Sequence, residues 1–354
     1  MTPDSPLKAP DYFMHRCLDL AKLGQSYVAP NPMVGAVLVY DGRIIGEGYH
    51  RQYGEAHAEV NCLNAVKEVD RKFISKSTLY VSLEPCNFFG KTPPCTDLIL
   101  KNKIPKVVIG CRDPNKVVNG KGIENLKTAG VDIGLAAGEM EKKCIDLNKR
   151  FYTFQTQQRP YIILKWAGSA NNKIAGTGST RLFISNEKTN RLVHKWRSEE
   201  ASILVGTNTA LQDDPELTNR FWEGPSPIRL VMDMDLKLPE SLKIFNRKQR
   251  TIIFNSQKHE EKENLVFYKI EKDKNLVRQL VQSLFQLNIQ SVLVEGGAKL
   301  LQSFIDENIW DEIRVIKNEQ LVINNGLASP QLPPLTTVEE TRIGNDLVNT
   351  YIRS

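Results

Sequence analysis

The stretch that decides the fold runs from residue 57 to residue 95 and contains His57-Ala58-Glu59, Pro85-Cys86 and Pro93-Pro94-Cys95. One imidazole and two thiolates are ligands that Zn²⁺ takes in tetrahedral sites, and three protein ligands leave a fourth position open for water. Zinc lowers the pKa of such a water to about 7, but a nearby group must still carry protons to the substrate and the leaving group. The pattern therefore predicts a catalytic zinc site with His57, Cys86 and Cys95 as ligands and Glu59 as the acid/base.

A closed structural zinc site is the alternative, and it needs a fourth ligand. Cys62 and His50 are the candidates. Neither belongs to a Cys-x₂-Cys or His-x₃-His pair, which structural sites commonly use. Ligand count therefore favours the open, catalytic site.

Composition limits the class of protein and its surroundings. The chain has 354 residues, 41% hydrophobic and 25% charged, with a formal net charge of +6. This length suffices for two domains, and the modest charge without a basic block does not require a nucleic-acid partner. No window approaches 18 uninterrupted apolar residues, so we expect no membrane segment. Six cysteines are too sparse for a disulfide scaffold, which favours a cytoplasmic protein.

The first half alternates strands and helices, a pattern typical of an α/β layered domain. We expect helices near residues 13–21, 56–69, 96–101 and 123–128, and strands at 34–40, 43–46, 78–83, 106–110 and 130–135. Both ends of the metal-binding stretch then lie at the start of helices.

The second half alternates again after a polar, aromatic connector near residues 148–159. We expect strands near 161–166, 202–205, 228–233, 251–255, 291–294, 311–315 and 347–352, with helices near 186–197, 274–287 and 299–305. The boundary lies near Arg159-Pro160, giving domains at 1–152 and 158–354. Glu295-Gly296-Gly297 follows a strand and opens a helix, where backbone N–H groups can meet a phosphate; alone, it also fits a tight turn.

The metal-binding stretch and its neighbours resemble a known family. The residues that carry the resemblance are Asn31-Pro32-Met33-Val34-Gly35, His50, Gly54 to Glu59, Glu84-Pro85-Cys86 and Gly90 to Cys95. Together they are similar to the deaminase half of the bifunctional deaminase/reductase family of riboflavin biosynthesis. The resemblance implies a cytidine-deaminase-like, three-layer domain in which Asn31, His50, Lys91 and Asp113 bind the substrate.

The second half resembles the reductase half of the same family, which has a dihydrofolate-reductase-like fold and uses NADPH. The matching segments are Leu164 to Ala167, Arg197, Gly206 to Thr209, Asp213 to Pro215, Leu217 to Arg220, and Glu295 to Gly297. The resemblance implies substrate contacts from Arg197, Asp213, Leu217, Arg220 and Glu295, with the arginines on the phosphate. It implies cofactor contacts from Ala167, Phe183, Thr209 and Gly297.

The chain departs from the family pattern at three places. Phe88 stands where the family usually has a histidine, and Ser169-Ala170-Asn171-Asn172-Lys173 stands where it usually reads Ser-x-Asp-Gly-Lys. Arg181 replaces a small polar residue. A polar contact in the deaminase, and a carboxylate and a glycine in the reductase, are therefore missing.

The implied reaction has two steps on a small pyrimidine ribosyl phosphate. They are zinc-dependent hydrolytic deamination of 2,5-diamino-6-(ribosylamino)-4(3H)-pyrimidinone 5'-phosphate and NADPH-dependent reduction of the ribosyl group to ribityl. We also expect a homo-oligomer formed through the reductase domain. A nucleic-acid base deaminase with an accessory domain is one alternative, but it predicts Pro-Cys-x-x-Cys spacing and a basic, aromatic-lined groove. A member of the same family with one degenerate domain is the other.

Overall fold

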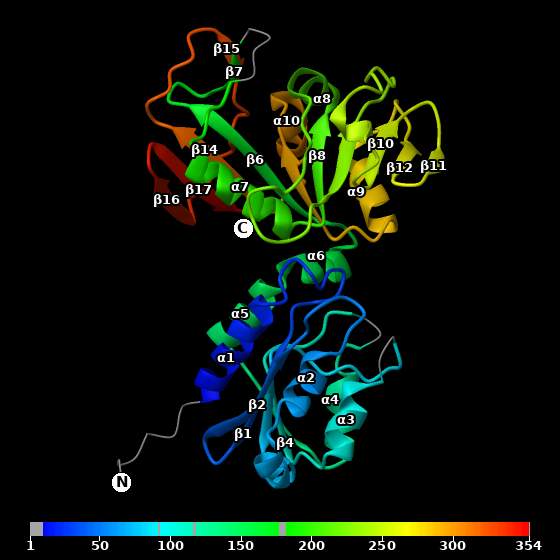
Figure 1. Ribbon diagram of the computed structural model, residues 1–354, viewed down its shortest axis with the longest axis vertical. Helices are drawn as coiled ribbons and strands as arrows, with labels where there is room; N and C mark the ends of the chain where they lie inside the picture. The colour runs from blue at the N-terminus through cyan, green and yellow to red at the C-terminus, as the bar shows by residue number, and fades with distance from the viewer. Residues whose placement is uncertain (1–9, 91–92, 116–117, 177–181, 354) are drawn as a thin grey trace. The chain divides into compact units, whose positions relative to one another are not determined.

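A computed structural model describes residues 10–90, 93–115, 118–176 and 182–353 of the chain. The chain forms two compact units, Met1–Gln158 and Arg159–Ser354, coloured from blue to green and from green to red in Figure 1. Each unit has its own sheet and its own hydrophobic core. The α/β class that the sequence predicts is confirmed in both.

The first unit is built on a five-stranded sheet in the order β2-β1-β3-β4-β5. β1 pairs antiparallel with β2 and β3, whereas β3, β4 and β5 are parallel. Its elements are α1 (Pro10–Lys22), β1 (Gly35–Tyr40), β2 (Arg43–Tyr49), α2 (Ala58–Asn64), the 3₁₀ helix η1 (Glu68–Lys76), β3 (Thr78–Val81), α3 (Cys95–Lys101), β4 (Lys106–Ile109), α4 (Lys121–Thr128), β5 (Asp132–Leu135), α5 (Glu139–Leu147) and α6 (Lys149–Gln157).

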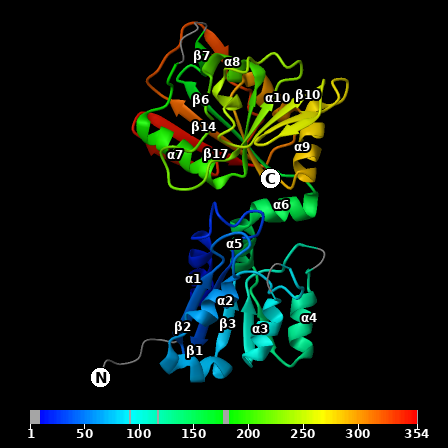
Figure 2. The same cartoon turned by 45° about the vertical axis from the view of Figure 1, so that its right-hand side comes forward.

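The strand β1 shows why this unit has three layers. Ala36 and Leu38 belong to a core shared with α2, α3 and α4, whereas Val37 and Val39 belong to a core shared with α1 and α5. Successive side chains of a strand point to opposite faces. Apolar residues at every position therefore bury both faces under helices, as Figure 2 shows for α1 and α2.

Three segments of the first unit differ from the sequence prediction, and one of them is the helix α5, which was not predicted. The helix predicted at 56–69 ends at Asn64, because Val66 turns into the core at 3% exposure and the chain continues as η1. The segment predicted as a connector contains the helix α6, in which Phe151 and Phe154 are buried. Their spacing of three residues places both on one helix face, which the sequence analysis missed.

The second unit is built on a ten-stranded sheet in the order β11-β12-β10-β9-β8-β13-β6-β14-β17-β16 and a two-stranded sheet, β15-β7. Its elements are β6 (Tyr161–Ser169), β7 (Lys173–Gly176), α7 (Glu187–Glu199), β8 (Ser202–Gly206), α8 (Thr207–Asp213), β9 (Ile228–Met232), η2 (Lys243–Phe245), β10 (Thr251–Asn255), β11 (Glu260–Lys262), β12 (Leu265–Lys269), α9 (Leu276–Gln286), β13 (Ser291–Glu295), α10 (Ala298–Asp306), β14 (Glu312–Asn318), β15 (Gly326–Ala328), β16 (Glu339–Ile343) and β17 (Asp346–Ile352).

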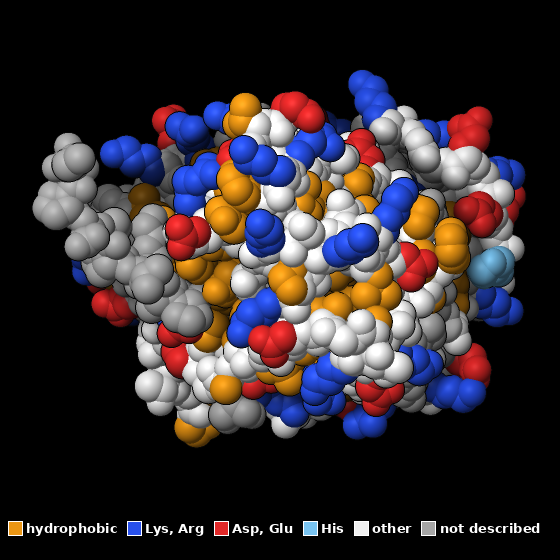
Figure 3. Space-filling model, turned by 90° about the horizontal axis from the view of Figure 1, so that it is seen from below, with side chains coloured by type: hydrophobic (Ala, Val, Ile, Leu, Met, Phe, Trp, Pro, Cys, Tyr) orange, Lys and Arg blue, Asp and Glu red, His pale blue; other side chains and the backbone are white. Residues whose placement is uncertain are grey.

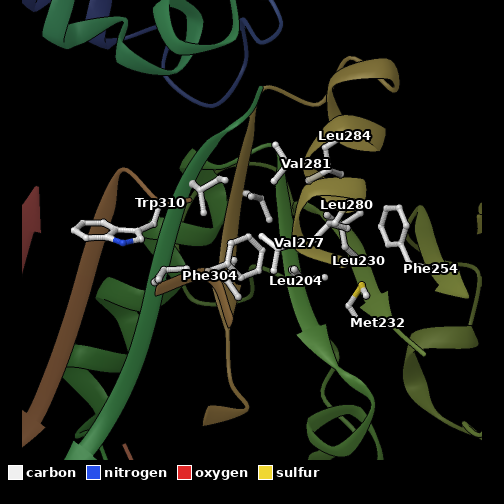
Figure 4. Packing of buried hydrophobic residues seen from close by; sticks show 14 of the residues in the cluster. Leu204, Leu230, Met232, Phe254, Val277, Leu280, Val281, Leu284, Phe304 and Trp310 are labelled. Atoms are coloured by element: carbon white, nitrogen blue, oxygen red, sulfur yellow. The ribbon is translucent and has the colours of Figure 1, made fainter. Parts of the chain in front are cut away.

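Both faces of the large sheet are covered. Figure 4 shows part of one core, in which the α9 residues Val277, Leu280, Val281 and Leu284 pack with the strand residues Leu204 and Leu230. On the opposite face, Val193 and Trp196 of α7 pack against Tyr161, Ile163 and Leu293. The alternation again follows from the period of two residues in a strand.

The central strands place their carboxyl ends side by side. β8, β13, β6 and β14 are neighbours and run parallel. Ligands of open α/β sheets bind beyond the carboxyl ends of such strands. Glu295, the last residue of β13, is paired in register with Lys165 of β6, so the side chains predicted around these two residues come together where β13 ends.

Charge is spread over the molecular surface that Figure 3 shows. Lys and Arg side chains alternate there with Asp and Glu rather than gathering on one area. Among the described residues, no helix combines the length and apolar character needed to cross a membrane.

Candidate active sites

Three predicted metal ligands converge in the first unit. His57 Nδ1 lies 3.3 Å from Cys95 Sγ and 3.5 Å from Cys86 Sγ, and the candidate ligand atoms of the three residues all lie within 4.8 Å of one another. With Zn–S of about 2.3 Å and Zn–N of about 2.0–2.1 Å, ligand atoms of a tetrahedral site are roughly 3.5–3.8 Å apart. The donor set and its spacing therefore fit one zinc ion.

Local folding explains the convergence. His57 is the N-cap of α2 and Cys95 is the first residue of α3, while the Cys95 backbone N–H donates to Cys86 Sγ at 3.4 Å. Two helix N-termini thus face the cluster, and they favour thiolates there.

The hydrogen bond between the two thiols shifts their pKa values in opposite directions. The hydrogen bond from Cys95, followed by that from His57, holds the pKa of the Cys86 thiol well below its ordinary value. The same bond raises the pKa of the Cys95 thiol. A divalent cation between the sulfurs would favour the thiolate form of both cysteines. Bound zinc would therefore offset the raised pKa of the Cys95 thiol.

Neither candidate for a fourth protein ligand joins the cluster. Cys62 is fully buried in the core under α2. His50 Nδ1 lies 3.1 Å from the Ala56 carbonyl and its Nε2 lies 3.1 Å from Asn31 Nδ2. Within the described residues the cluster has three members, which agrees with an open site.

Glu59 lies in the first turn of α2, two residues after His57, and is 3% exposed. Burial raises the pKa of its carboxyl, and the charge of Cys86 adds to that effect. A carboxyl whose pKa is raised towards neutrality is suited to both accepting and donating a proton.

One cavity of about 250 Å³ contains the predicted substrate side of this site. It is lined by the predicted residues Asn31, His50, His57, Glu59, Cys86 and Asp113, and also by Tyr53, Glu84, Phe88, Asn115 and Phe151. Its size is close to the lower end of small-molecule pockets, about 300–1,000 Å³. Lys91 lies outside the described residues.

Hydrogen bonds and burial affect the ionisation of both Asp113 and His50 in this pocket. A hydrogen bond from the Asn115 backbone N–H reaches Asp113 Oδ1 at 2.8 Å, while burial raises the pKa of Asp113 to about 6. If His50 donates from Nδ1 to the Ala56 carbonyl, its Nε2 is left to accept from Asn31. Burial lowers the pKa of His50, in agreement with that neutral form.

A second set of predicted residues meets in the other unit, where the carboxyl end of β13 lies beside β6. Arg197 Nη2 lies 2.7 Å from Glu295 Oε2 and Lys165 Nζ lies 3.6 Å from the same oxygen. Burial opposes ionisation of Glu295, but Arg197 and then Lys165 outweigh it and lower the pKa of the carboxyl to about 2. Arg197 is already held by protein groups here, since its Nη1 also faces the Thr218 carbonyl at 3.4 Å.

His194 links this cluster to Arg220. Its Nδ1 accepts a hydrogen bond from the Arg220 backbone N–H at 3.0 Å, and its ring meets Phe221 edge to face. Burial, followed by the charges of Arg197 and Arg220, lowers the pKa of His194 to about 4. The imidazole is therefore neutral near pH 7. His194 was not predicted, because a single histidine on a helix has no local signal.

Two predicted cofactor residues lie against each other. A Cβ built on Gly296 would stand 2.8 Å from Thr209 Cγ2, and one on Gly297 would stand 3.3 Å from Thr209 Oγ1. Both glycines have positive φ, at +86° and +72°. The backbone from β13 into α10 is therefore closely packed against the first turn of α8 only because both residues lack side chains.

The remaining predicted residues of this unit are placed less directly. Leu217 is 2% exposed in a core cluster with φ of 53°, so its side chain cannot meet a ligand and only its backbone could. Asp213 ends α8, and Ala167 lies near the end of β6. Phe183 is 77% exposed, and Arg181 lies outside the described residues.

Comparison with known proteins identifies both units. Residues 7–111 match the cytidine and deoxycytidylate deaminase zinc-binding region, and residues 160–321 match the RibD C-terminal domain. Riboflavin biosynthesis protein RibD of Aquifex aeolicus is 38% identical, with 96% of this chain and 98% of that protein covered. RibD of Bacillus amyloliquefaciens is 34% identical, with 97% and 96% covered.

The chain belongs to the RibD family. It is a bifunctional enzyme of riboflavin biosynthesis with a zinc-binding deaminase region and a reductase domain. A solved Thermotoga maritima structure, named diaminohydroxyphosphoribosylaminopyrimidine deaminase/5-amino-6-(5-phosphoribosylamino)uracil reductase, superposes with a TM-score of 0.87 at 34% identity and covers 97% of this chain and 98% of its own. The family and the two-part fold predicted from sequence are thereby confirmed.

Two of the three departures from the RibD pattern lie among the residues that the structure describes. Asn171 Oδ1 accepts from the Ser169 hydroxyl at 2.7 Å and from the Ile323 backbone N–H at 3.2 Å, while its Nδ2 donates to the Ile323 carbonyl at 2.9 Å. Asn172 has φ of 58°, a conformation that asparagine tolerates better than most residues. The turn between β6 and β7 is therefore built without the usual carboxylate and glycine. Phe88 lines the deaminase pocket and is 41% exposed.

Proposed function

We propose that the chain deaminates 2,5-diamino-6-(ribosylamino)-4(3H)-pyrimidinone 5'-phosphate and then reduces the ribosyl group of the product to ribityl with NADPH. The convergence of His57, Cys86, Cys95 and Glu59 on one small pocket carries the first half of this proposal. The name of the Thermotoga maritima protein supports the choice of substrate.

In the deaminase, we assign His57, Cys86 and Cys95 to the zinc ion, which supplies an activated water when bound. Glu59 would hold a proton at its carboxylate and move protons between the activated water, the substrate ring and the leaving ammonia. Asn31, His50 and Asp113 orient the pyrimidine and the ribose from the pocket wall, and Lys91 is assigned to the phosphate. The aromatic rings of Tyr53, Phe88 and Phe151 give the pocket an apolar side.

In the reductase, NADPH supplies a hydride to C1′ of the ribose when bound. We assign its contacts to Ala167, Phe183, Thr209 and Gly297, because Thr209 and Gly297 pack together at the end of β13. Arg220, with 42% of its side chain exposed, is accessible to a substrate phosphate. Arg197 holds Glu295 for the ribose, and Asp213 and the backbone of Leu217 complete the substrate contacts.

The proposal extends to organisation and location. We place the deaminase domain at 1–152 and the reductase domain at 158–354, close to the division between the two compact units. A cytoplasmic location is supported by six cysteines that all remain free thiols. We also propose a homo-oligomer formed through the reductase domain, which sedimentation analysis of the purified protein would test.

Product analysis by mass tests the two reactions. Without NADPH, the purified protein should convert the diaminopyrimidinone substrate to the deaminated ribosylamino compound and stop there. With NADPH, the ribityl product should follow. Conversion with NADH at an equal rate would overturn the choice of cofactor, and an unchanged substrate would overturn the deaminase assignment.

A further inference from the structure

Glu84 is a buried carboxylate that gathers backbone N–H groups from a distant part of the deaminase unit. It is 3% exposed. Oε2 accepts from the N–H of Asp113 at 3.3 Å and of Gly120 at 3.0 Å, and Oε1 accepts from Gly122 at 3.0 Å and Ile123 at 3.3 Å. A single side chain thus binds both ends of the connection from β4 to α4.

Backbone N–H groups, rather than a Lys or Arg side chain, stabilise the Glu84 carboxylate. Among the described residues, Glu84 forms no ion pair, and its four donors include the first turn of α4, where the helix dipole favours an anion. Charge-assisted hydrogen bonds are stronger than neutral ones, and losing them in a buried site is costly. The arrangement is therefore rigid.

Close packing around Gly122 also holds the start of α4 in place. Gly122 approaches so tightly that a Cβ there would lie 2.2 Å from the Pro85 carbonyl oxygen and 3.2 Å from Glu84 Oε1. Glu84 also donates its own N–H to the Cys111 carbonyl at 3.0 Å. The start of α4 is consequently held against the segment that carries Cys86.

We propose that Glu84 is a positioning residue of the deaminase, which fixes Asp113 relative to the zinc ligand Cys86. Glu84 is two residues before Cys86 in the chain and is bonded to the backbone of Asp113 itself. Asp113 and Cys86 line the same cavity. Glu84 therefore connects the metal side of the pocket with the side assigned to the substrate.

The substitution Glu84→Gln tests this role, because it keeps the shape but exchanges one acceptor oxygen for an NH₂ group facing two N–H donors. We expect KM for the pyrimidine ribosyl phosphate to rise about tenfold or more, since losing such bonds weakens binding by that order. The turnover number, the zinc content and the reductase rate should stay near those of the unsubstituted protein. Amide hydrogen exchange at Gly120 and Gly122 should become faster.

Glu124→Gln is the matched control, because it removes the same charge from an exposed position in the first turn of the same helix. It should leave KM and the exchange of both amides unchanged. If Glu84→Gln does not fold, Glu84→Asp keeps the charge but shortens the reach, and it should show the same change in KM to a smaller degree.

Two results would overturn the proposal. The first is unchanged KM together with unchanged amide exchange. The second is loss of zinc and turnover at constant KM, which would mean that Glu84 only supports Cys86. The kinetic test rests on the proposed function, whereas the exchange test does not. Failure of the unsubstituted protein to deaminate would therefore refute the substrate assignment and leave the exchange result to decide on Glu84.

Discussion

Arg197 and Glu295 form a buried, two-pronged ion pair, with Nη2 2.7 Å from Oε2 and Nε 3.0 Å from Oε1. The pair joins the last turn of α7 to the end of β13. Removing one partner of a buried pair leaves the other charged and poorly solvated, which costs about 3–5 kcal/mol.

Arg197→Ala should therefore damage the reductase in two ways. We expect the free energy of unfolding of the reductase unit to fall by about 3 kcal/mol, and the reductase kcat/KM to fall by roughly 100-fold, as Glu295 loses its main partner. Deamination should continue, so the unreduced ribosylamino compound should accumulate. Denaturant unfolding and product analysis by mass measure both effects.

Arg191→Ala is the control for Arg197→Ala, because Arg191 lies on the same helix and is exposed. Arg191→Ala should change neither the free energy of unfolding of the reductase unit nor the reductase kcat/KM. Loss of deamination in a folded Arg197→Ala protein would show that the two activities are not separable, and the boundary near residue 155 would have to be redrawn.

The second prediction concerns the metal. Cys86→Ser should lose most of the zinc, which we expect at one ion per chain, because a hydroxyl is a much poorer ligand than a thiolate. Elemental analysis of the dialysed protein gives the stoichiometry. Cys62→Ala should retain zinc, since Cys62 lies outside the cluster. A Cys62→Ala protein without zinc would revive the closed, four-ligand site.

The third prediction separates proton transfer from metal binding. Glu59→Gln should keep zinc and fold but lower the deaminase turnover number by about 100-fold to 10,000-fold, the usual contribution of a positioned acid/base. The starting compound should then remain, in contrast to Arg197→Ala. Glu68→Gln, at an exposed position of η1, is the control. Deamination by Glu59→Gln at the original rate would exclude Glu59 as the proton carrier.

The fourth prediction concerns pH and the buried His194. Its pKa is about 4 in the folded protein, below the ordinary value of 6.5. Between these values the unfolded chain binds a proton at His194 that the folded chain does not, so the contribution of His194 to stability is constant above about pH 6.5 and is lost as the pH drops towards 4. The loss from this group should approach about 3 kcal/mol.

Denaturant unfolding at several pH values measures this slope. His194→Asn retains an acceptor for the Arg220 N–H but cannot titrate, so it should flatten the curve between pH 6.5 and 4. His259→Asn, at an exposed position, should not. Equal slopes in all three proteins would show that His194 is accessible to protons in the folded state.

The candidate metal site could be proposed from the sequence because the relevant information is local. His57 and Glu59 are two residues apart at the start of one helix, and Cys86 precedes Cys95 at the start of another, so residue type and spacing sufficed for the proposal. The sequence analysis quoted Glu84 in the Glu84-Pro85-Cys86 motif but predicted no role for it, for the opposite reason. Its hydrogen-bond partners lie 29 to 39 residues away. No short sequence pattern predicts a carboxylate that accepts hydrogen bonds from such distant backbone N–H groups.

The reductase shows the same limit at the level of topology. Most of its strands were predicted from apolar runs, but short strands such as β7 and β11 were not, because three or four residues carry little pattern. β13 pairs with β8 and β6, two strands that are far from it in the sequence. This pairing brings Glu295 close to Lys165 and Arg197, a proximity that only the family resemblance indicated.

Neighbouring residues of β1 belong to opposite cores, and this arrangement bears on how the deaminase unit can open. If α2 were released from one face, Ala36 and Leu38 would be exposed while Val37 and Val39 on the same backbone remained packed under α1. Exposing Ala36 and Leu38 would remove the apolar burial that holds one face of β1, so we expect the two helix layers to unfold in a single cooperative step. The pocket that contains His57 and Cys86 is then kept or lost as a whole, with no half-folded form in which the zinc ligands survive alone.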